Sequence, residues 1–388
     1  MDYGGQILKA SIWDHWPQLK NRLITKRQYR ILNFSGGLAR YSPLDKVMSK
    51  FVRRFVGSYL YSVKLEVNTS CTLSCKMCYI HENGKQISLE AICMFLDQIR
   101  SCGVRLEILG GEPLLRKDIT EIVSYAKDKA EVPFVTLYTN GLAATNGMSS
   151  ALHDAGLDAA IVTLISHRKE VHDAFTGVKG SWEQTVEGIR NLIRAKVATY
   201  TFTAIHSDNY TDFEDIDKFV RKDLGAHALF YQYIPQKAGD PLIIPRETWH
   251  RIKHSVLMEK NRPHMEFVRK FYMLTGNACS GGNFVLTIKA NGEVQPCPFI
   301  SDLPIGNIYR SSIWDIYRNR YRHTQLREFK KLPDECAGCS YGSVCSGGCK
   351  AGNNILFGSY SHRDHHCQGP YNERFDHERV LDCIPTFF

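Results

Sequence analysis

The chain has 388 residues, of which 43% are hydrophobic and 23% are charged, a balance typical of a globular protein with one large or two moderate domains. It contains no apolar run of eighteen residues and no secretion signal, so we expect no membrane span and a cytoplasmic location. The formal charge of +9 is concentrated in residues 1–60, where eleven Lys and Arg stand against three Asp, so the charge does not indicate a nucleic-acid partner.

Residues 1–60 are expected to form a basic extension that contains an amphipathic helix. Apolar residues recur at helical spacing between Leu44 and Val56. The opposite face is basic, with Lys46, Lys50, Arg53 and Arg54. Such a helix docks an acidic partner or a membrane surface, or it packs on the rest of the protein with its basic face in solvent.

Residues 61–235 alternate β-rich runs with amphipathic stretches, which indicates an α/β fold. The predicted strands are Ser62–Val67, Arg105–Leu109, Phe134–Tyr138, Ala160–Leu164, Thr199–Ile205 and Ala228–Ile234. The helical patterns between them include Leu89–Arg100, Ile119–Lys129, Trp182–Lys196 and Phe213–Lys222. Six βα repeats with nearly continuous apolar strands predict a parallel sheet covered by helices, either a partial barrel or a doubly wound sheet.

Three polar motifs follow three consecutive predicted strands. Cys71-x3-Cys75-x2-Cys78 follows the first strand, Gly110-Gly111-Glu112-Pro113 the second and Thr139-Asn140-Gly141 the third. Because chemistry in such folds lies at the carboxyl ends of the strands, we expect the three motifs to meet at one site.

The remainder of the chain divides by composition into a helical connector over residues 236–276, a Cys-rich domain over 277–375 and a tail over 376–388. In the Cys-rich domain, Phe284–Ile288 and Glu293–Gln295 flank Asn291-Gly292, which predicts a β-hairpin with a two-residue turn. Beyond the hairpin, Gly, Cys and short turns dominate, as expected where metal organises the fold.

Ten of the thirteen cysteines belong to two spacing patterns. The first is the Cys71 triplet, and the second runs Cys279-x12-Gly292-x4-Cys297, Cys336-x2-Cys339-x5-Cys345-x3-Cys349 and Cys367. Thiolates grouped in this way are metal ligands, and three ligands leave one iron of a cubane free to bind another molecule. The alternative for the second set is a zinc knuckle on the Cys336–Cys349 run, which leaves Cys279, Cys297 and Cys367 unexplained.

These residues resemble the radical S-adenosylmethionine (radical SAM) enzymes. The resemblance rests on Cys71, Cys75 and Cys78 with Gly110–Pro113, and the second cysteine set resembles the SPASM extension of that family. It covers the chain from about Ser62 to Cys367. It implies a partial (β/α)6 barrel of the TIM type, followed by a small SPASM domain with a hairpin and auxiliary cluster sites.

The resemblance implies a cofactor site at the strand ends. A [4Fe-4S] cluster on the triplet would bind S-adenosylmethionine, and reductive cleavage would give a 5′-deoxyadenosyl radical that abstracts a substrate hydrogen. The backbone and carboxylate of Gly110, Gly111 and Glu112 would receive the methionine amine. Met77 would lie near the adenine, with Thr139, Asn140 and Thr163 along the ribose and carboxylate. For Asn140 and Thr163, ordinary strand-end hydrogen bonding is the alternative.

The resemblance also implies two auxiliary [4Fe-4S] clusters, which makes three clusters in all. One cluster would be held by Cys336, Cys339, Cys345 and Cys367, and the other by Cys279, Cys297 and Cys349. A two-residue turn would place Cys297 across from Leu286, and Phe284–Thr287 contains no thiol, so the second cluster would have an open iron or a ligand other than cysteine. Further ligand candidates, for which a surface position is the alternative, are Cys383, His362, His365 and His366.

The sequence departs from the family pattern at two places. After the fourth predicted strand, where family members often read Ser-Leu-Asp-Gly, the chain reads Thr163-Leu-Ile-Ser166-His167. Thr176 stands where family members often have Arg, so an Arg contact to the cofactor carboxylate is not carried over. His172 and Asp173 occupy a motif position, but they would serve equally as helix caps. No residue is singled out as a catalytic acid or base, although Tyr231, Tyr233 and Asp364 are polar residues that would point inward.

We expect an enzyme that modifies a peptide or protein by a thioether or carbon–carbon crosslink or by dehydrogenation. The alternative is oxidation or decarboxylation of a small molecule such as a sugar or tetrapyrrole, and a third possibility is an electron carrier without enzymatic activity. The expected partners are a reductant such as flavodoxin or ferredoxin and the substrate. Sixty residues are few for a leader-binding domain, so a separate leader-binding partner is a further expectation.

Overall fold

The computed structural model describes residues 59–80, 84–259, 279–376 and 379–385. The amphipathic helix expected between Leu44 and Val56 lies outside these ranges. A sheet of nine strands organises the described part of the chain. Among the described residues, no helix is both long enough and apolar enough to cross a membrane.

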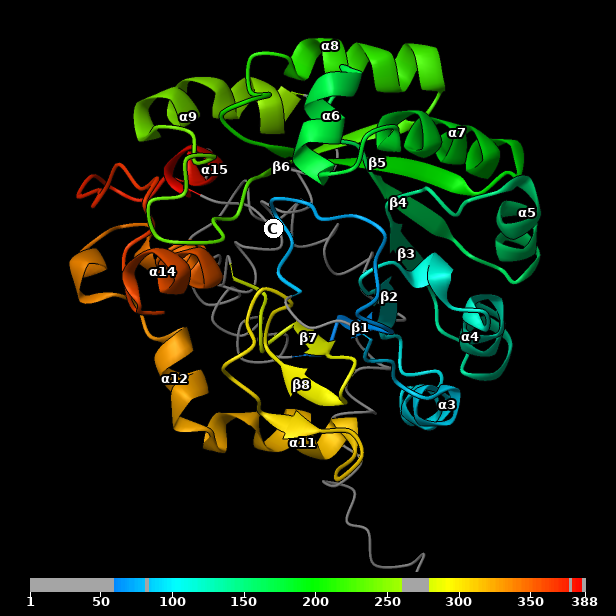
Figure 1. Cartoon of the computed structure of the whole chain (residues 1–388). Helices are drawn as coiled ribbons and strands as arrows, with labels where there is room; N and C mark the ends of the chain where they lie inside the picture. Colours follow the sequence, from blue (N-terminus) through cyan, green and yellow to red (C-terminus); the bar gives the residue numbers. More distant parts are fainter. Residues whose placement is uncertain (1–58, 81–83, 260–278, 377–378, 386–388) are drawn as a thin grey trace, which may run out of the picture.

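Six parallel strands form the first part of the sheet. They are β1 (Ser62–Glu66), β2 (Arg105–Leu109), β3 (Val135–Thr139), β4 (Ala159–Thr163), β5 (Ala198–Ile205) and β6 (His227–Gln232). They lie side by side in chain order, so the sheet curves in one direction as a partial barrel (Figure 1). A doubly wound sheet would reverse its order at a switch point, so that alternative is excluded.

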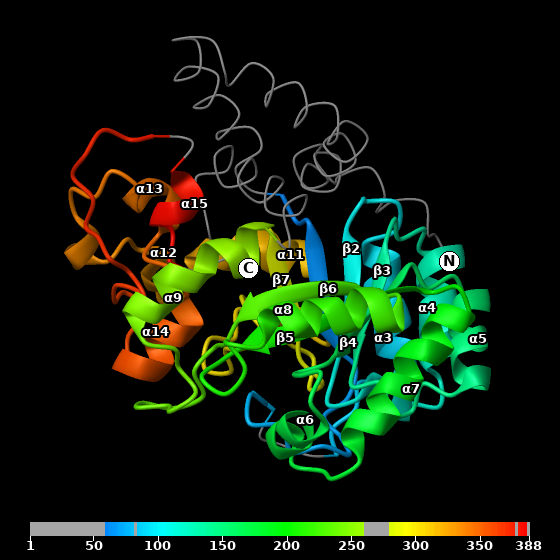
Figure 2. The same ribbon diagram turned by 90° about the horizontal axis from the view of Figure 1, so that it is seen from above.

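Helices cover the outer face of these strands (Figure 2). They are α3 (Leu89–Gln98), α4 (Ile119–Ser124) with the π-helical turn η3 (Tyr125–Lys129), α5 (Asn146–Asp154), α7 (Ser181–Arg194) and α8 (Phe213–Lys218) with the π-helical turn η4 (Phe219–Leu224). A further helix, α6 (Lys169–Thr176), packs against α7 and lies beside the loop that follows β1. Side-chain caps start two of them, because Ser88 accepts from the amide of Ala91 and Thr145 from that of Met148. The strands and helices enclose an apolar core that includes the fully buried Leu65.

The same strands present a different face to the barrel interior. Successive side chains of a strand point to opposite sides, and Lys64, Glu107, Tyr138 and Tyr231 occupy the half-buried positions between the buried apolar ones. Tyr231 on β6 lies near Glu107 on β2, although three strands separate β2 from β6 in the sheet. Only the curvature of the sheet brings these residues together, so they line the interior.

The C-terminal region extends the same sheet. It begins with α9 (Arg246–Lys253) and the π-helical turn η5 (His254–Glu259), and it continues through β7 (Val285–Ile288), β8 (Glu293–Gln295), β9 (Gly306–Asn307), α11 (Ile313–Asn319), α12 (Thr324–Lys330), α13 (Gly342–Cys345), α14 (Lys350–Phe357) and α15 (Val380–Cys383). Strand β7 pairs in parallel with β1 and antiparallel with β8. The predicted hairpin is therefore present, and it also joins the barrel sheet at β1.

The turn of this hairpin differs from the expected one. Thr287 lies opposite Gln295, and the amide of Lys289 donates to the carbonyl of Glu293, so three residues rather than two form the turn. Gly292 takes the left-handed conformation at φ +80° that the longer turn requires. The expected pairing of Cys297 with Leu286 is wrong by one residue, because this register, continued, places Cys297 across from Val285.

Candidate functional site

The three cysteines of the first triplet lie on the loop that follows β1. The loop is held against the end of α6, since the amides of Ser74 and Lys76 donate to the carbonyls of Thr176 and Phe175 at 2.9 and 3.0 Å. A tight turn brings two of the thiols together, because the amide of Cys78 donates to the carbonyl of Cys75 at 3.0 Å. The loop therefore presents its thiols beside the carboxyl ends of the barrel strands.

These thiols fit a metal centre. Burial, together with neighbouring Cys71 and Cys78, raises the pKa of Cys75 to about 12. Burial likewise raises the pKa of Cys71. Converging thiols of this kind ionise only when a cation offsets their mutual repulsion, and an iron–sulfur cluster supplies that charge.

Close backbone packing places the glycine motif against the cluster loop. A Cβ atom on Gly111 would lie 2.3 Å from the carbonyl oxygen of Ser70, so only glycine fits there. The amides of Gly111 and Glu112 donate to the carbonyls of Asn68 and Ser70 at 2.9 and 2.7 Å. Gly110 is equally tight, because its Cβ would lie 2.3 Å from Oδ1 of Asn68. The motif and the segment leading to Cys71 therefore form one unit.

The carboxylate of Glu112 links the second and third strand ends. It accepts hydrogen bonds from Thr139 Oγ1 and the amide of Asn140, both at 2.7 Å, and from the amide of Leu114 at 2.9 Å. The amide nitrogen Nδ2 of Asn140 in turn lies 3.8 Å from Cys71 Sγ. The structure thus brings these sequence-predicted residues together around the first cysteine. The Glu112 carboxylate thus accepts three hydrogen bonds that hold the strand ends together. Burial raises the pKa of this carboxyl group, and the hydrogen bonds act in the opposite direction.

Met77 and Thr163 lie at the same end of the barrel. Met77 is half-buried and packs with Cys75 against a small apolar cluster that includes Ile165 and Phe175. Thr163 is half-buried as the last residue of β4. Met77 belongs to the cluster loop itself, and Thr163 lies at the carboxyl end of β4.

Asp173, which occupies a family motif position, and Thr176, which departs from the family pattern, both have structural roles. Asp173 accepts hydrogen bonds from the amides of Gly180 and Trp182 and from the hydroxyl of Ser181, so it caps the start of α7. Thr176 is fully buried and shares a 2.7 Å hydrogen bond with Ser181. Thr176 therefore points into the packing between α6 and α7.

Sequence reasoning missed a polar group inside the barrel. Lys64 Nζ lies 3.0 Å from Glu107 Oε2, and Glu107 also accepts from the hydroxyls of Ser62 at 2.8 Å and Tyr138 at 3.3 Å. Burial alone would raise the pKa of Glu107, but Lys64 and these hydrogen bonds hold it below its usual range. The available signal was a pair of charged residues at alternate positions in each of two apolar strands, Lys64 and Glu66 in β1 and Arg105 and Glu107 in β2.

Aromatic rings complete the interior. Phe202 and Tyr231 stack with ring centroids 4.7 Å apart, and Tyr79 lies 4.9 Å from Phe299. Burial, and to a smaller extent Glu107, raises the pKa of Tyr231 to about 12, so its hydroxyl stays protonated. Tyr79 directly follows Cys78 and lies near Cys297, which places it between the first cysteine loop and the C-terminal cysteines.

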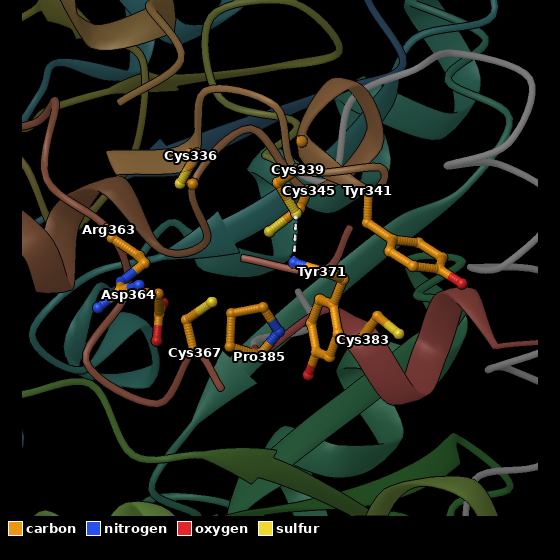
Figure 3. A pocket seen from close by; sticks show the side chains of 12 residues that line it. Cys336, Cys339, Tyr341, Cys345, Arg363, Asp364, Cys367, Tyr371, Cys383 and Pro385 are labelled. Atoms are coloured by element: carbon orange, nitrogen blue, oxygen red, sulfur yellow. Dashed lines mark hydrogen bonds between the residues drawn. The ribbon is translucent and has the colours of Figure 1, made fainter. Parts of the chain in front are cut away.

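Five of the C-terminal cysteines line one pocket (Figure 3). Four of them are the predicted ligands Cys336, Cys339, Cys345 and Cys367, and the fifth is Cys383. Backbone amides point at two of the sulfurs, from Tyr371 to Cys339 Sγ at 3.4 Å and from Gly369 to Cys367 Sγ at 3.3 Å. Amide-to-sulfur contacts of this kind accompany cluster ligation. Burial raises the pKa of Cys336 to about 11, which again requires a metal for ionisation.

The other three cysteines gather separately. Cys349 lies near Cys279 and Cys297, and Cys349 Sγ accepts from the amide of Gly352 at 3.3 Å. Cys349 does not line the pocket of Cys336, Cys339, Cys345 and Cys367, which favours a division into four and three ligands over a Cys336–Cys349 zinc knuckle. Cys383 and His366 are buried at 4% and 2% exposure, so the surface position expected as their alternative is wrong.

Comparisons with known proteins agree with this geometry. The model of the radical SAM superfamily matches residues 65–220, and that of the SPASM iron–sulfur cluster-binding domain matches residues 279–340. An AdoMet-dependent heme synthase of Methanosarcina barkeri is 28% identical over 339 residues, which cover 78% of this chain and 94% of the relative. The subtilosin biosynthesis protein AlbA of Bacillus subtilis is 26% identical, with 80% and 71% covered. The structure of Streptococcus suis SuiB bound to S-adenosylmethionine superposes with a TM-score of 0.65 at 17% identity, covering 80% of this chain and 78% of SuiB.

Proposed function

Because the chain is a radical SAM enzyme with a C-terminal SPASM iron–sulfur domain, we propose that it modifies a side chain of a peptide or protein held inside the barrel. The modification would be a thioether or carbon–carbon crosslink or a dehydrogenation. Three [4Fe-4S] clusters would be present, one on the Cys71 triplet and two on the C-terminal cysteines. A ferredoxin or flavodoxin would supply the electron, and a separate protein would present the leader of the peptide.

The residues at the strand ends hold and orient the cofactor in this proposal. The cluster and S-adenosylmethionine, when bound, supply the one-electron chemistry that removes a hydrogen atom from an unactivated carbon. Since the Glu112 carboxylate is occupied by three hydrogen bonds, the backbone of Gly110 and Gly111 would receive the methionine amine. Met77 would border the adenine. Thr139 and Asn140 fix the loop that carries the site, and Asn140 also contacts Cys71.

The observation that carries the peptide assignment is the charge balance of the barrel interior. Lys64 is paired with Glu107, and Lys289 is paired with Glu66 at 2.8 Å. Aromatic rings lie beside these pairs, including Tyr79, Phe202 and Tyr231. A neutral apolar or aromatic side chain fits such an interior, whereas a substrate with several carboxylates would enter it without matching positive charge.

The second candidate is oxidation or decarboxylation of a tetrapyrrole. It is favoured by the heme synthases, which match this chain at 27–28% identity, slightly above the 26% of AlbA. In that case Lys64 or Lys289 would exchange its internal partner for a substrate carboxylate.

One experiment separates the candidates. Reconstituted enzyme, dithionite and S-adenosylmethionine are incubated with short peptides encoded beside the gene, and in parallel with a porphyrin carrying propionate side chains. The peptide proposal predicts a peptide product that has lost two hydrogen atoms. Loss of carbon dioxide from the porphyrin with every peptide unchanged would replace it by the second candidate.

A further inference from the structure

Lys350 is a cation buried in the C-terminal region. Its side chain is 1% exposed, and its ammonium donates one hydrogen bond, at 2.8 Å, to the carbonyl of Lys331. Within the described residues, no carboxylate oxygen lies within 4.0 Å of it. A buried ammonium has three donors and a full charge, so a single carbonyl does not offset its loss of hydration.

The position of Lys350 in its helix does not stabilise the buried positive charge either. Lys350 is the first residue of α14, and Cys349 is the N-cap. The start of a helix carries partial positive charge, which favours anions and disfavours a lysine. A lysine buried at this position therefore requires negative charge from elsewhere in the fold.

The cysteines of both auxiliary sites lie near this ammonium. Cys279, Cys345, Cys336 and Cys349 favour its charged form, although burial lowers the pKa of Lys350. A Cβ atom placed on Gly347, which lines the pocket of Cys336 and Cys345, would lie 3.5 Å from Lys350 Nζ. Cys279 and Cys349 belong to the group of three, and Cys336 and Cys345 to the group of four. Lys350 and Cys279 also line one pocket of about 320 Å³. The ammonium thus lies between the two groups of thiols.

We propose that Lys350 is the shared counter-cation of the two auxiliary clusters and raises the reduction potential of both. Reduction adds negative charge to a cluster, and a fixed positive charge in a dry environment stabilises the reduced form. Lys350 is a positioning residue in this account, since it acts on the clusters and not on the substrate. The inference rests on the two auxiliary clusters of the proposed function.

Two neighbouring lysines provide comparisons. Lys330 donates to the carbonyl of Cys279 at 2.8 Å and lies near Cys279 and Cys297, so it neighbours the group of three. Lys331 carries its charge in solvent, with a side chain 53% exposed. Lys330→Met should therefore alter mainly one auxiliary potential, and Lys331→Met should alter neither.

The test is a redox titration followed by electron paramagnetic resonance, on full-length protein in which Cys71, Cys75 and Cys78 are replaced by Ala. This background removes the signal of the first cluster. Lys350→Met should lower the midpoint potential of both auxiliary signals, whereas Lys350→Arg, which keeps the charge, should stay near the parent value. Loss of auxiliary iron from Lys350→Met with retention in Lys350→Arg also supports the proposal, because the charge would then be needed to hold the clusters.

Two results would overturn the inference. The first is that Lys350→Met keeps both auxiliary clusters and leaves both midpoint potentials unchanged. The second is that Lys350→Arg changes the midpoint potentials, or loses auxiliary iron, as much as Lys350→Met does. The iron content of the parent background, expected at about eight atoms per chain for two [4Fe-4S] clusters, separates this failure from a failure of the cluster assignment itself.

Discussion

Lys289 Nζ lies 2.8 Å from Glu66 Oε2, and this ion pair joins the end of β1 to the hairpin of the C-terminal region. Glu66 is 3% exposed, and its other oxygen accepts from the amide of Ala290 at 3.3 Å. Lys289 also donates to the carbonyl of Pro298 at 3.2 Å, beside Cys297. The pair therefore fixes an auxiliary ligand relative to the strand that leads to the Cys71 loop.

Breaking this pair on one side should be costly. Lys289→Met leaves the Glu66 carboxylate buried without its cation, and we expect the free energy of unfolding to fall by about 3 kcal/mol. The double variant Lys289→Met with Glu66→Gln should recover part of that loss, because no charge then remains buried. Denaturant unfolding of the three proteins measures both effects, and a double variant no more stable than Lys289→Met would refute the pairing argument.

Gly111→Ala should disturb the cluster loop. The added Cβ would lie 2.3 Å from the Ser70 carbonyl, and overpacking of this kind costs about 1–3 kcal/mol. Because Ser70 precedes Cys71, we expect the first cluster to bind less iron while the auxiliary clusters are kept. The control is Gly147→Ala in α5, which meets no atom within 4 Å and should stabilise the protein by about 0.5–1 kcal/mol. Unchanged iron content in Gly111→Ala would contradict the close packing.

Lys64→Met should separate substrate turnover from cofactor cleavage. Lys64 lies inside the barrel and pairs with Glu107. We expect kcat/KM for product formation to fall about tenfold or more, with little change in the release of 5′-deoxyadenosine without substrate. Lys127→Met, which breaks a 2.7 Å ion pair with Asp158 outside the barrel, is the matched control. An equal loss in both activities of Lys64→Met would remove this residue from the substrate cavity.

Stability should decline in mild acid because two histidines are buried in neutral form. Burial lowers the pKa of both His172 and His206 from 6.5 to about 4. Below pH 6.5 the two histidines bind protons in the unfolded chain, whereas in the folded protein they stay neutral until the pH approaches 4. The free energy of unfolding therefore decreases as the pH falls from 6.5 toward 4. Between pH 7.5 and 5.5 each histidine should contribute a loss of about 1.3 kcal/mol.

Urea unfolding of the holoenzyme at both pH values measures this effect. His172→Gln keeps an acceptor for the amide of Ile165, which now donates to His172 Nδ1 at 3.3 Å, and it should reduce the pH dependence. The same pH dependence in this variant as in the parent would show that His172 already ionises in the folded state.

Local sequence patterns predicted the parallel strands, the hairpin and the meeting of three motifs at one strand edge, because apolar periodicity and motif spacing are local properties. Helices α5 and α6 and the pairing of β7 with β1 were not predicted, since α5 and α6 are short and β7 contacts β1 across more than two hundred residues. The interior ion pair of Lys64 and Glu107 was not predicted either. Which residues face each other across two strands depends on the register of the strands, and the sequence of one strand does not give that register.

The most direct test of the central claim is release of 5′-deoxyadenosine. Anaerobically reconstituted protein, with about twelve iron atoms per chain for three clusters, should release it from S-adenosylmethionine in the presence of dithionite. Cys75→Ala should abolish the release. Cys93→Ala, which changes a half-buried cysteine on α3 outside both patterns, should not. Release that persists in Cys75→Ala would contradict the assignment of the first cluster and the chemistry derived from it.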